Sequence, residues 1–143
     1  MAGILFLCVA NSARSQLAEG IAREMAPELD IWSAGSDPSH VRPQVRRVLN
    51  EVGYDDKGLR SKSLFEVEMD EINLIITLCR EEQCPILPGH KQHLHWPLPD
   101  PAAAPDEEKD EAYRATRDEL IRRLPPLLRE VEAGAYSTTS KTG

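Results

Sequence analysis

The stretch GILFLCVANSARSQLAEG, residues 3–20, decides how this chain of 143 residues folds. Its opening is a nearly continuous apolar run without charge, which predicts a short buried strand. Further on, apolar side chains recur at four-residue spacing at Leu17, Ile21 and Met25, which predicts an amphipathic helix. Cys8 therefore stands where a buried strand passes into a helix.

The alternation of strand and helix continues along the chain. Apolar and β-branched runs predict further strands at residues 30–34, 72–79 and 93–96. Helical periodicity predicts helices at residues 44–52 and 107–132, with a short helix or turn around residues 65–69. Pro125 and Pro126 are expected to interrupt or kink the last helix. The pattern predicts an α/β fold, a three-layer sandwich with a four-stranded parallel sheet.

Length and composition indicate a single domain over residues 1–135, followed by a flexible tail over residues 136–143. No apolar run approaches the length of about 20 residues that a membrane span needs, so we expect a cytoplasmic monomer. The formal net charge of −7 argues against nucleic-acid binding. It leaves room for a local anion site, and we expect neither a metal nor a cofactor.

The segment that joins the first strand to its helix has the features of an anion cradle. Inward-pointing N–H groups and the helix N-terminus supply donors, and Arg14 can grip two oxygens of a tetrahedral anion. The same positive field stabilises a thiolate at Cys8, to which the Ser15 hydroxyl can donate. Asn11 tolerates a left-handed backbone. The expected oxyanion-binding residues are Val9, Ala10, Asn11, Ser12, Ala13, Arg14 and Ser15. The alternative is an ordinary buried cysteine ahead of a solvated helical turn.

The segment resembles the low-molecular-weight protein tyrosine phosphatase fold, and more closely its arsenate reductase branch. NSARSQLAEG looks like the NSCRSQMAEG of that branch, with Ala13 where many members carry cysteine. The phosphatases usually have proline where this chain has Gln16. Further similarities follow in order: WSAG, IITLCREEQCPILPG, HWPLPDPA and YRATRDEL.

The chain has three cysteines: Cys8, Cys79 and Cys84. In a cytosolic context they are expected to serve catalysis, redox chemistry or metal binding rather than cross-linking. IITLCREEQCPILPG is similar to the thioredoxin-coupled arsenate reductases, although their cysteine pair is often spaced more widely. The resemblance implies a Cys8–Cys79–Cys84 relay that reduces arsenate, with phosphate or sulfate as competing oxyanions. Thioredoxin is the expected reductant, and a glutaredoxin or small thiol remains open.

The resemblance also implies a general acid. Asp100 stands before Pro101, which restricts it to an extended backbone, and this Asp-Pro corresponds to the acid of the family. Phosphatases of this fold commonly carry tyrosines just after it, and these stack on an aromatic substrate. This chain has alanines at positions 102–104, which favours a small inorganic oxyanion.

Some members of the family bind potassium beneath the loop, through an asparagine, a glutamate, a serine and an aspartate. Asn11, Glu19 and Ser33 match the first three, and Lys62 stands at the fourth position. We expect Lys62 to act as a built-in cation that makes the protein independent of potassium. The alternative is an ordinary surface lysine.

Other interpretations of the same residues remain. A zinc site could use Cys79, Cys84, His90, His93 and His95. Against zinc, no C-x-x-C pair is present, and His93 and His95 are expected to face opposite sides of their strand. The enzyme alternative is a phosphatase of this family without redox function. The non-enzyme alternative is a sensor that only binds the oxyanion.

Overall fold

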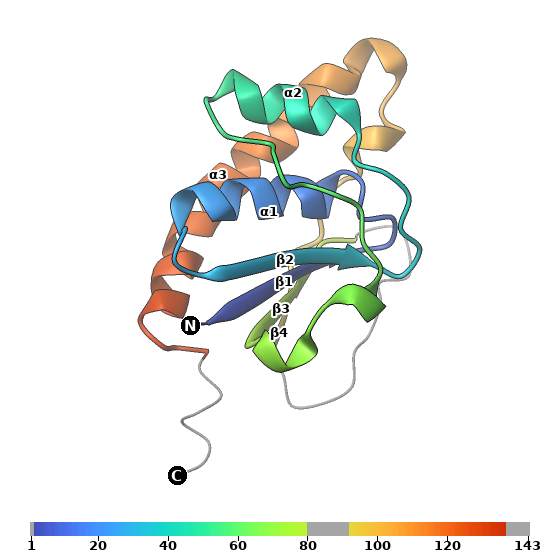
Figure 1. The fold of residues 1–143 in the computed structure, drawn as a ribbon. Helices are drawn as coiled ribbons and strands as arrows, with labels where there is room; N and C mark the ends of the chain where they lie inside the picture. Colours follow the sequence, from blue (N-terminus) through green and yellow to red (C-terminus); the bar gives the residue numbers. More distant parts are fainter. Residues whose placement is uncertain (1, 80–91, 137–143) are drawn as a thin grey trace.

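The computed structural model describes residues 2–79 and 92–136 (Figure 1). Its strands and α-helices follow the chain as β1 (Gly3–Cys8), α1 (Arg14–Met25), β2 (Asp30–Gly35), α2 (Pro43–Glu51), β3 (Leu74–Thr77), β4 (Gln92–His95) and α3 (Lys109–Glu132). Four short 3₁₀-helices fill the connections: η1 (Leu64–Glu66), η2 (Met69–Glu71), η3 (Pro101–Ala103) and η4 (Asp106–Glu108).

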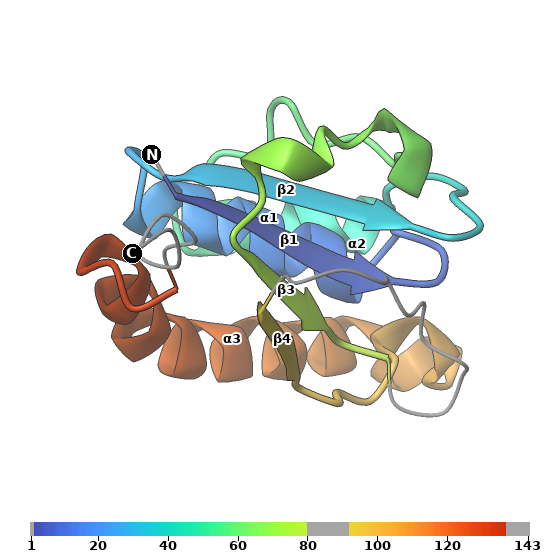
Figure 2. The same ribbon diagram turned by 90° about the horizontal axis from the view of Figure 1, so that it is seen from below.

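The four strands form one parallel sheet in the order β2-β1-β3-β4 (Figure 2). Cys8 pairs with Gly35 on one side of β1, and Leu7 pairs with Thr77 on the other. Because every strand runs the same way, the carboxyl ends of β1 and β3 lie at one edge of the sheet. The prediction of an α/β fold with a four-stranded parallel sheet is confirmed.

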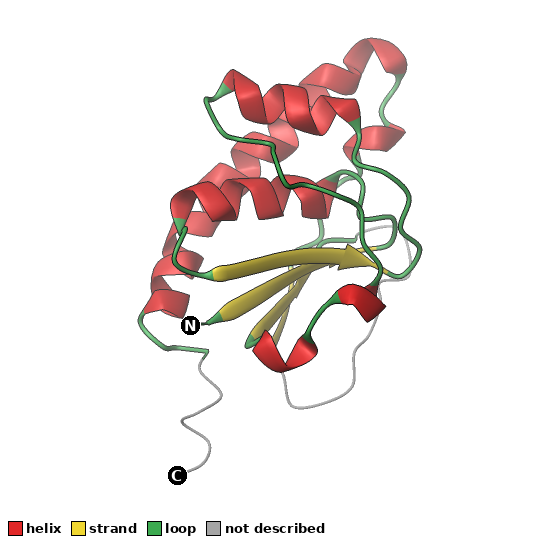
Figure 3. Ribbon diagram, in the orientation of Figure 1, coloured by secondary structure: helices red, strands yellow, loops and turns green. Residues whose placement is uncertain are grey.

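Alternating side chains of β1 divide the core between the two faces of the sheet. Ile4 and Phe6 pack with the buried faces of α1, α2 and α3. Leu5 and Leu7 pack with the segment that carries η1 and η2. The three layers are therefore α-helices, the sheet, and a thin cover of short helices (Figure 3).

The last helix corrects one expectation. Helix α3 continues through Pro125 and Pro126, so the predicted interruption was wrong, while the alternative of a kink stays a prediction. Each proline removes a backbone donor, yet Leu124, Leu127 and Leu128 are buried around them. Their packing against the main cluster offsets the lost hydrogen bonds, since tertiary burial rather than local propensity supplies most of a helix's stability.

The last residue that the structure describes packs on the core. Tyr136, the first residue of the expected tail, packs partly buried on the main apolar cluster, and residues 137–143 lie outside the described part. Within the described residues, none of the helices has the length and apolar character required to cross a bilayer.

Candidate active site

The candidate site begins where β1 ends. Strand β1 brings Cys8 to the carboxyl edge of the sheet, where its Sγ lies 2.9 Å from the Ser15 Oγ. Between them, Asn11 adopts the left-handed backbone with φ of +48°. Both features match the sequence prediction. The loop thus turns back on itself and sets the hydroxyl of the first helical turn against the thiol.

Arg14 joins this loop to the far side of the site. Its side chain is buried, and its Nη1 donates to the Leu98 carbonyl over 3.0 Å. Its Nη2 lies 3.9 Å from Oδ2 of Asp100. The N-cap residue of α1 is Ala13, whose side chain makes no capping hydrogen bond. The backbone amides and partial positive charge of that terminus add to the positive charge that the Arg14 guanidinium brings to the site.

A small pocket lies among these groups, with a volume of about 30 Å³. It is lined by Cys8, Ala10, Ser12, Ala13, Arg14 and Asp100. Val9, Asn11 and Ser15 were also predicted to bind the oxyanion, but they lie outside this lining. The Val9 carbonyl accepts from the Asp37 amide, and the Asn11 side chain points beneath the loop. The space holds a few water-sized groups, as a small inorganic anion would need.

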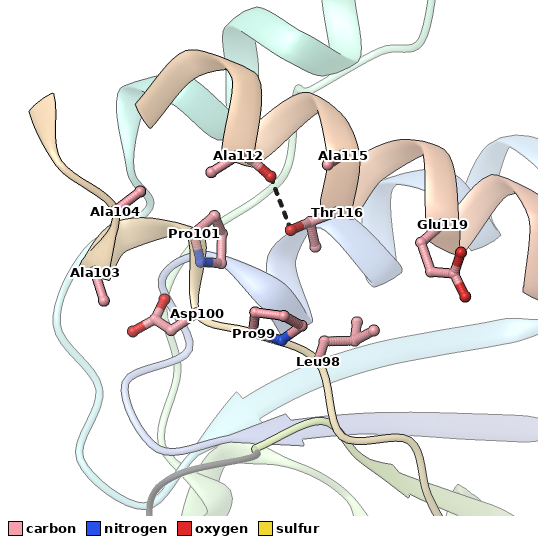
Figure 4. A pocket seen from close by; sticks show the side chains of 10 residues that line it. All are labelled: Leu98, Pro99, Asp100, Pro101, Ala103, Ala104, Ala112, Ala115, Thr116 and Glu119. Carbon is pink, nitrogen blue, oxygen red and sulfur yellow. Dashed lines mark hydrogen bonds between the residues drawn. The ribbon is translucent and has the colours of Figure 1, made fainter. Parts of the chain in front are cut away.

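Asp100 approaches the pocket on the loop formed by residues 98–104, which we call the acid loop. Its backbone is extended, as the following proline predicted, and its Oδ1 accepts from the Ala102 amide over 3.0 Å. Figure 4 shows the acid loop beside α3, with the Asp100 carboxylate directed away from that helix. A pocket of about 470 Å³ lies between part of this loop and α3, with Ala112, Ala115 and Thr116 on the helix side, while Pro101 is itself buried.

Beneath the nucleophile loop, residues 8–15, lies a buried polar network. The Asn11 amide nitrogen donates to the hydroxyls of Ser15 and Ser33 over 2.8 and 3.0 Å. The Asn11 amide oxygen accepts from the Lys62 backbone and from the Gln16 side chain over 2.8 and 3.0 Å. Four hydrogen bonds therefore fix the residue with the unusual backbone. Gln16 was not predicted to take part.

The network ends in a buried carboxylate. Glu19 is fully buried; it accepts from the Ser33 hydroxyl and lies 3.4 Å from the Lys62 Nζ. Its other oxygen lies 2.6 Å from the Arg23 guanidinium. Burial lowers the pKa of Lys62, while the neighbouring Glu19 carboxylate acts to raise it. The predicted set of Asn11, Glu19, Ser33 and Lys62 is brought together, and the interpretation of Lys62 as a surface residue was wrong.

The second cysteine lies at the same edge of the sheet as Cys8. Cys79 is buried two residues beyond the end of β3, and the preceding Leu78 donates its amide to the Leu7 carbonyl over 2.9 Å. The two cysteines therefore follow neighbouring strands at similar depth. Cys84 and His90 lie outside the described residues.

The two histidines of β4 correct another expectation. His95 Nδ1 lies 2.7 Å and His93 Nε2 lies 3.3 Å from the Thr77 hydroxyl oxygen. The expectation that they face opposite sides was wrong, because side chains two residues apart on a strand share a face. Over residues 2–79 and 92–136, no three His, Cys, Asp or Glu side chains are grouped to hold a metal ion.

Comparison with known proteins gives a family and close relatives. Residues 3–136 match the family described as low molecular weight phosphotyrosine protein phosphatase. Arsenate reductases of Halalkalibacterium halodurans and Bacillus subtilis are each 36% identical over 126 residues, which cover 85% of this chain and 91% of theirs.

The fold gives a similar result. A solved structure of an arsenate reductase in the phosphate binding state matches with a TM-score of 0.77 and 29% identity, covering 91% of this chain and 98% of that one. A thioredoxin-dependent arsenate reductase from Corynebacterium glutamicum matches with a TM-score of 0.72 and 26% identity, covering 94% of this chain and 63% of that one.

Proposed function

The chain belongs to the low molecular weight phosphotyrosine protein phosphatase family, and from this premise we propose that it reduces arsenate to arsenite. One observation carries the proposal. Cys79 lies buried at the same edge of the sheet as Cys8, two residues beyond the end of the neighbouring strand β3. A phosphatase needs one nucleophilic thiol, whereas a reductase must also supply two electrons. The named relatives, all arsenate reductases at comparable length, support this direction.

The proposed reaction starts at Cys8. Its thiolate attacks the arsenic atom, an As–S bond forms, and one arsenate oxygen leaves with a proton from Asp100. Arg14 and the loop amides hold the remaining oxygens, and the Ser15 hydroxyl stabilises the thiolate by donating to it. The 2.9 Å between the Cys8 Sγ and the Ser15 Oγ supports the last role.

The redox steps follow as thiol exchange. The Cys79 thiolate attacks the Cys8 sulfur; the As–S bond breaks with its electron pair on arsenic, and arsenite leaves. Cys84 then attacks Cys79, which forms the Cys79–Cys84 disulfide and releases Cys8 as a thiol. A thioredoxin dithiol reduces that disulfide and is itself oxidised. We expect a cytoplasmic monomer, and phosphate and sulfate should compete for the loop.

We also infer that Lys62 replaces a bound cation beneath the nucleophile loop. The support is geometric: the Lys62 Nζ lies within the polar network, 3.4 Å from Glu19 and 3.0 Å from the Arg60 carbonyl. A fixed ammonium neutralises the buried carboxylate without an ion from solution. Activity should therefore not depend on potassium.

A phosphatase without redox function is the second candidate. The nucleophile loop would serve it equally well, since a phosphate ester presents the same tetrahedral oxygens. One observation favours arsenate: the three alanines that follow Asp100 and Pro101 offer no aromatic side chain to stack on a phosphotyrosine ring. A sensor that only binds the anion would have no use for the carboxylate of Asp100 in that lining.

A single-turnover experiment tests the proposal. The fully reduced protein, free of added reductant, is mixed with arsenate, and arsenite is measured against enzyme concentration. We expect close to one arsenite per chain and a new disulfide by mass. Cys79→Ser should abolish arsenite formation while sparing weak hydrolysis of an aryl phosphate. Arsenite formation by Cys79→Ser at the wild-type level would show that the relay is wrong.

A further inference from the structure

One aromatic side chain stands entirely outside the core. Phe65, in η1, is 99% exposed, while the next exposed large hydrophobic of the described residues, Val52, is 37% exposed. Single exposed apolar residues are common, but a wholly exposed aromatic ring is not, because it forgoes the burial of a large apolar area. Phe65 contributes nothing to the packing of the chain, so its placement calls for another role.

The turn that carries Phe65 is fixed by side chains around it. The Ser63 hydroxyl accepts from the Phe65 amide over 2.9 Å, and the Glu66 carboxylate accepts from the Ser63 amide over 3.0 Å. The same carboxylate pairs with Arg60 over 2.8 Å. This reciprocal cap presents the ring on a preorganised turn. A partner that binds there pays little to order it.

A hollow of about 420 Å³ lies beside the ring. Its lining is Gly35, Ser36, Ser63, Leu64, Phe65 and Met69. None of these six side chains is charged, on a chain whose formal net charge is −7. The Phe65 hollow therefore matches a partner surface that is apolar and uncharged, rather than a basic one.

The hollow shares a wall with the nucleophile loop. Gly35 pairs with Cys8 at the end of β2, and a Cβ on Gly35 would lie 2.3 Å from the Val9 carbonyl oxygen. The backbone of residues 8 and 9 is thus in direct contact with the inner side of the hollow. Figure 1 shows η1 next to the carboxyl end of β2.

The hollow also lies on a face of the sheet that includes β3, the strand that precedes Cys79. Leu64 and Met69 pack on the cluster that contains Leu7 and Ile75, and the strand that carries Ile75 leads to Cys79. The Phe65 hollow therefore rests on the two strands, β1 and β3, that lead to the two thiols.

We propose that Phe65 and its hollow form the docking surface for the protein dithiol, of the thioredoxin class, that reduces the relay disulfide; this rests on the proposed function. Thiol–disulfide exchange needs sulfur in contact with sulfur. A protein reductant must therefore reach the edge of the sheet where Cys79 lies, and an aromatic side chain near that edge can serve as a binding hot spot. A small thiol such as glutathione needs no such surface.

The test compares Phe65→Ser with Val52→Ser, which removes the other exposed hydrophobic. Each protein is assayed with saturating arsenate, thioredoxin reductase and NADPH while thioredoxin is varied. Loss of a hot-spot side chain should raise the KM for thioredoxin about five- to thirtyfold in Phe65→Ser. Val52→Ser should match the wild type. The arsenite released in one turnover without reductant should be the same in all three.

Each other outcome overturns the docking surface. An unchanged KM for thioredoxin in Phe65→Ser would do so, as would an equal loss when dithiothreitol replaces thioredoxin, which would place the defect in the fold. Concentration-dependent dimers that disappear in Phe65→Ser would assign the hollow to a second copy of the chain. If the wild type releases no arsenite in one turnover, the proposed function fails; release with an unchanged KM refutes the docking surface alone.

Discussion

The nucleophile loop and the acid loop face the same pocket but are supported in opposite ways. Beneath the nucleophile loop, Asn11 makes four side-chain hydrogen bonds and Glu19 is paired with two cations. Beneath the acid loop lies a pocket of about 470 Å³. The acid loop is held by the burial of Leu98 and Pro101, by the Leu98 amide, which donates to the Leu78 carbonyl over 3.1 Å, and by the bond from Arg14 to the Leu98 carbonyl; Arg14 approaches Asp100 less closely.

The difference separates two requirements of the proposed chemistry. Binding an anion and ionising a thiol need fixed dipoles, which a rigid, satisfied network supplies before substrate arrives. An acid must deliver its proton and then recover it from solvent, which the partly exposed carboxylate of Asp100 can do. The proposed chemistry thus pairs a preorganised nucleophile with an acid that solvent reaches.

The largest effect should come from the acid. Asp100→Asn keeps the shape and the bond to the Ala102 amide but removes the proton donor. We expect the rate of arsenite formation in one turnover to fall by about 10²- to 10⁴-fold. Asp106→Asn, at an exposed aspartate of η4, is the matched control and should leave the rate unchanged. A wild-type rate for Asp100→Asn would remove the acid loop from the mechanism.

The next effect should appear in stability. Lys62→Met leaves Glu19 buried with only Arg23 beside it, so the free energy of unfolding should fall by about 3 kcal/mol. Thermal denaturation should show a loss of about 10 °C. Lys57→Met, at an exposed lysine, should change little.

The same measurement tests the built-in cation. The melting temperature of the wild type should be equal in potassium and in sodium chloride. A marked stabilisation by potassium alone would mean that the site beneath the nucleophile loop still binds a potassium ion. The rigidity of that loop, and with it the contrast to the acid loop, would then depend on the salt in the buffer.

The smallest effect concerns the pocket behind the acid loop. Ala112 on α3 is half-buried and lines that pocket, so Ala112→Leu should fill part of it. We expect the free energy of unfolding to rise by about 1 kcal/mol. A loss of comparable size, measured by urea denaturation, would instead mean that the loop is already closely packed on α3.

Features carried by contiguous sequence could be predicted. Strand β1, the turn at Asn11 and the Ser15 hydroxyl beside Cys8 follow from the continuous stretch of residues 3–15, whose types leave few alternatives. The end of β3 could not be placed in the same way. Leu78 and Cys79 continue the apolar run because they are buried, yet they lie beyond the last paired residue, Thr77. The apolar run at residues 72–79 therefore indicates which residues are buried, not which residues pair in the strand.

Two kinds of feature were missed. The ion pair between Glu19 and Arg23 is local, and their spacing of four residues on a helix could have revealed it. The others depend on packing between distant segments. Phe65 is different, because LFEVEM predicts a turn with apolar residues but does not say which of them finds a partner. The exposure of Phe65 depends on how Leu64 and Met69 meet the sheet. The course of α3 through its prolines depends likewise on the core beneath it.

The Thr77 hydroxyl restricts which ring nitrogens of His93 and His95 can carry a hydrogen. Its hydroxyl carries one hydrogen but lies within hydrogen-bonding distance of a ring nitrogen from both His93 and His95. At most one of those nitrogens can accept from it, so the other must bring its own hydrogen to share the oxygen. Because the Thr77 hydroxyl can also donate to the Leu94 carbonyl over 3.4 Å, both rings can donate to its oxygen, and the arrangement that is excluded is the one in which both ring nitrogens accept.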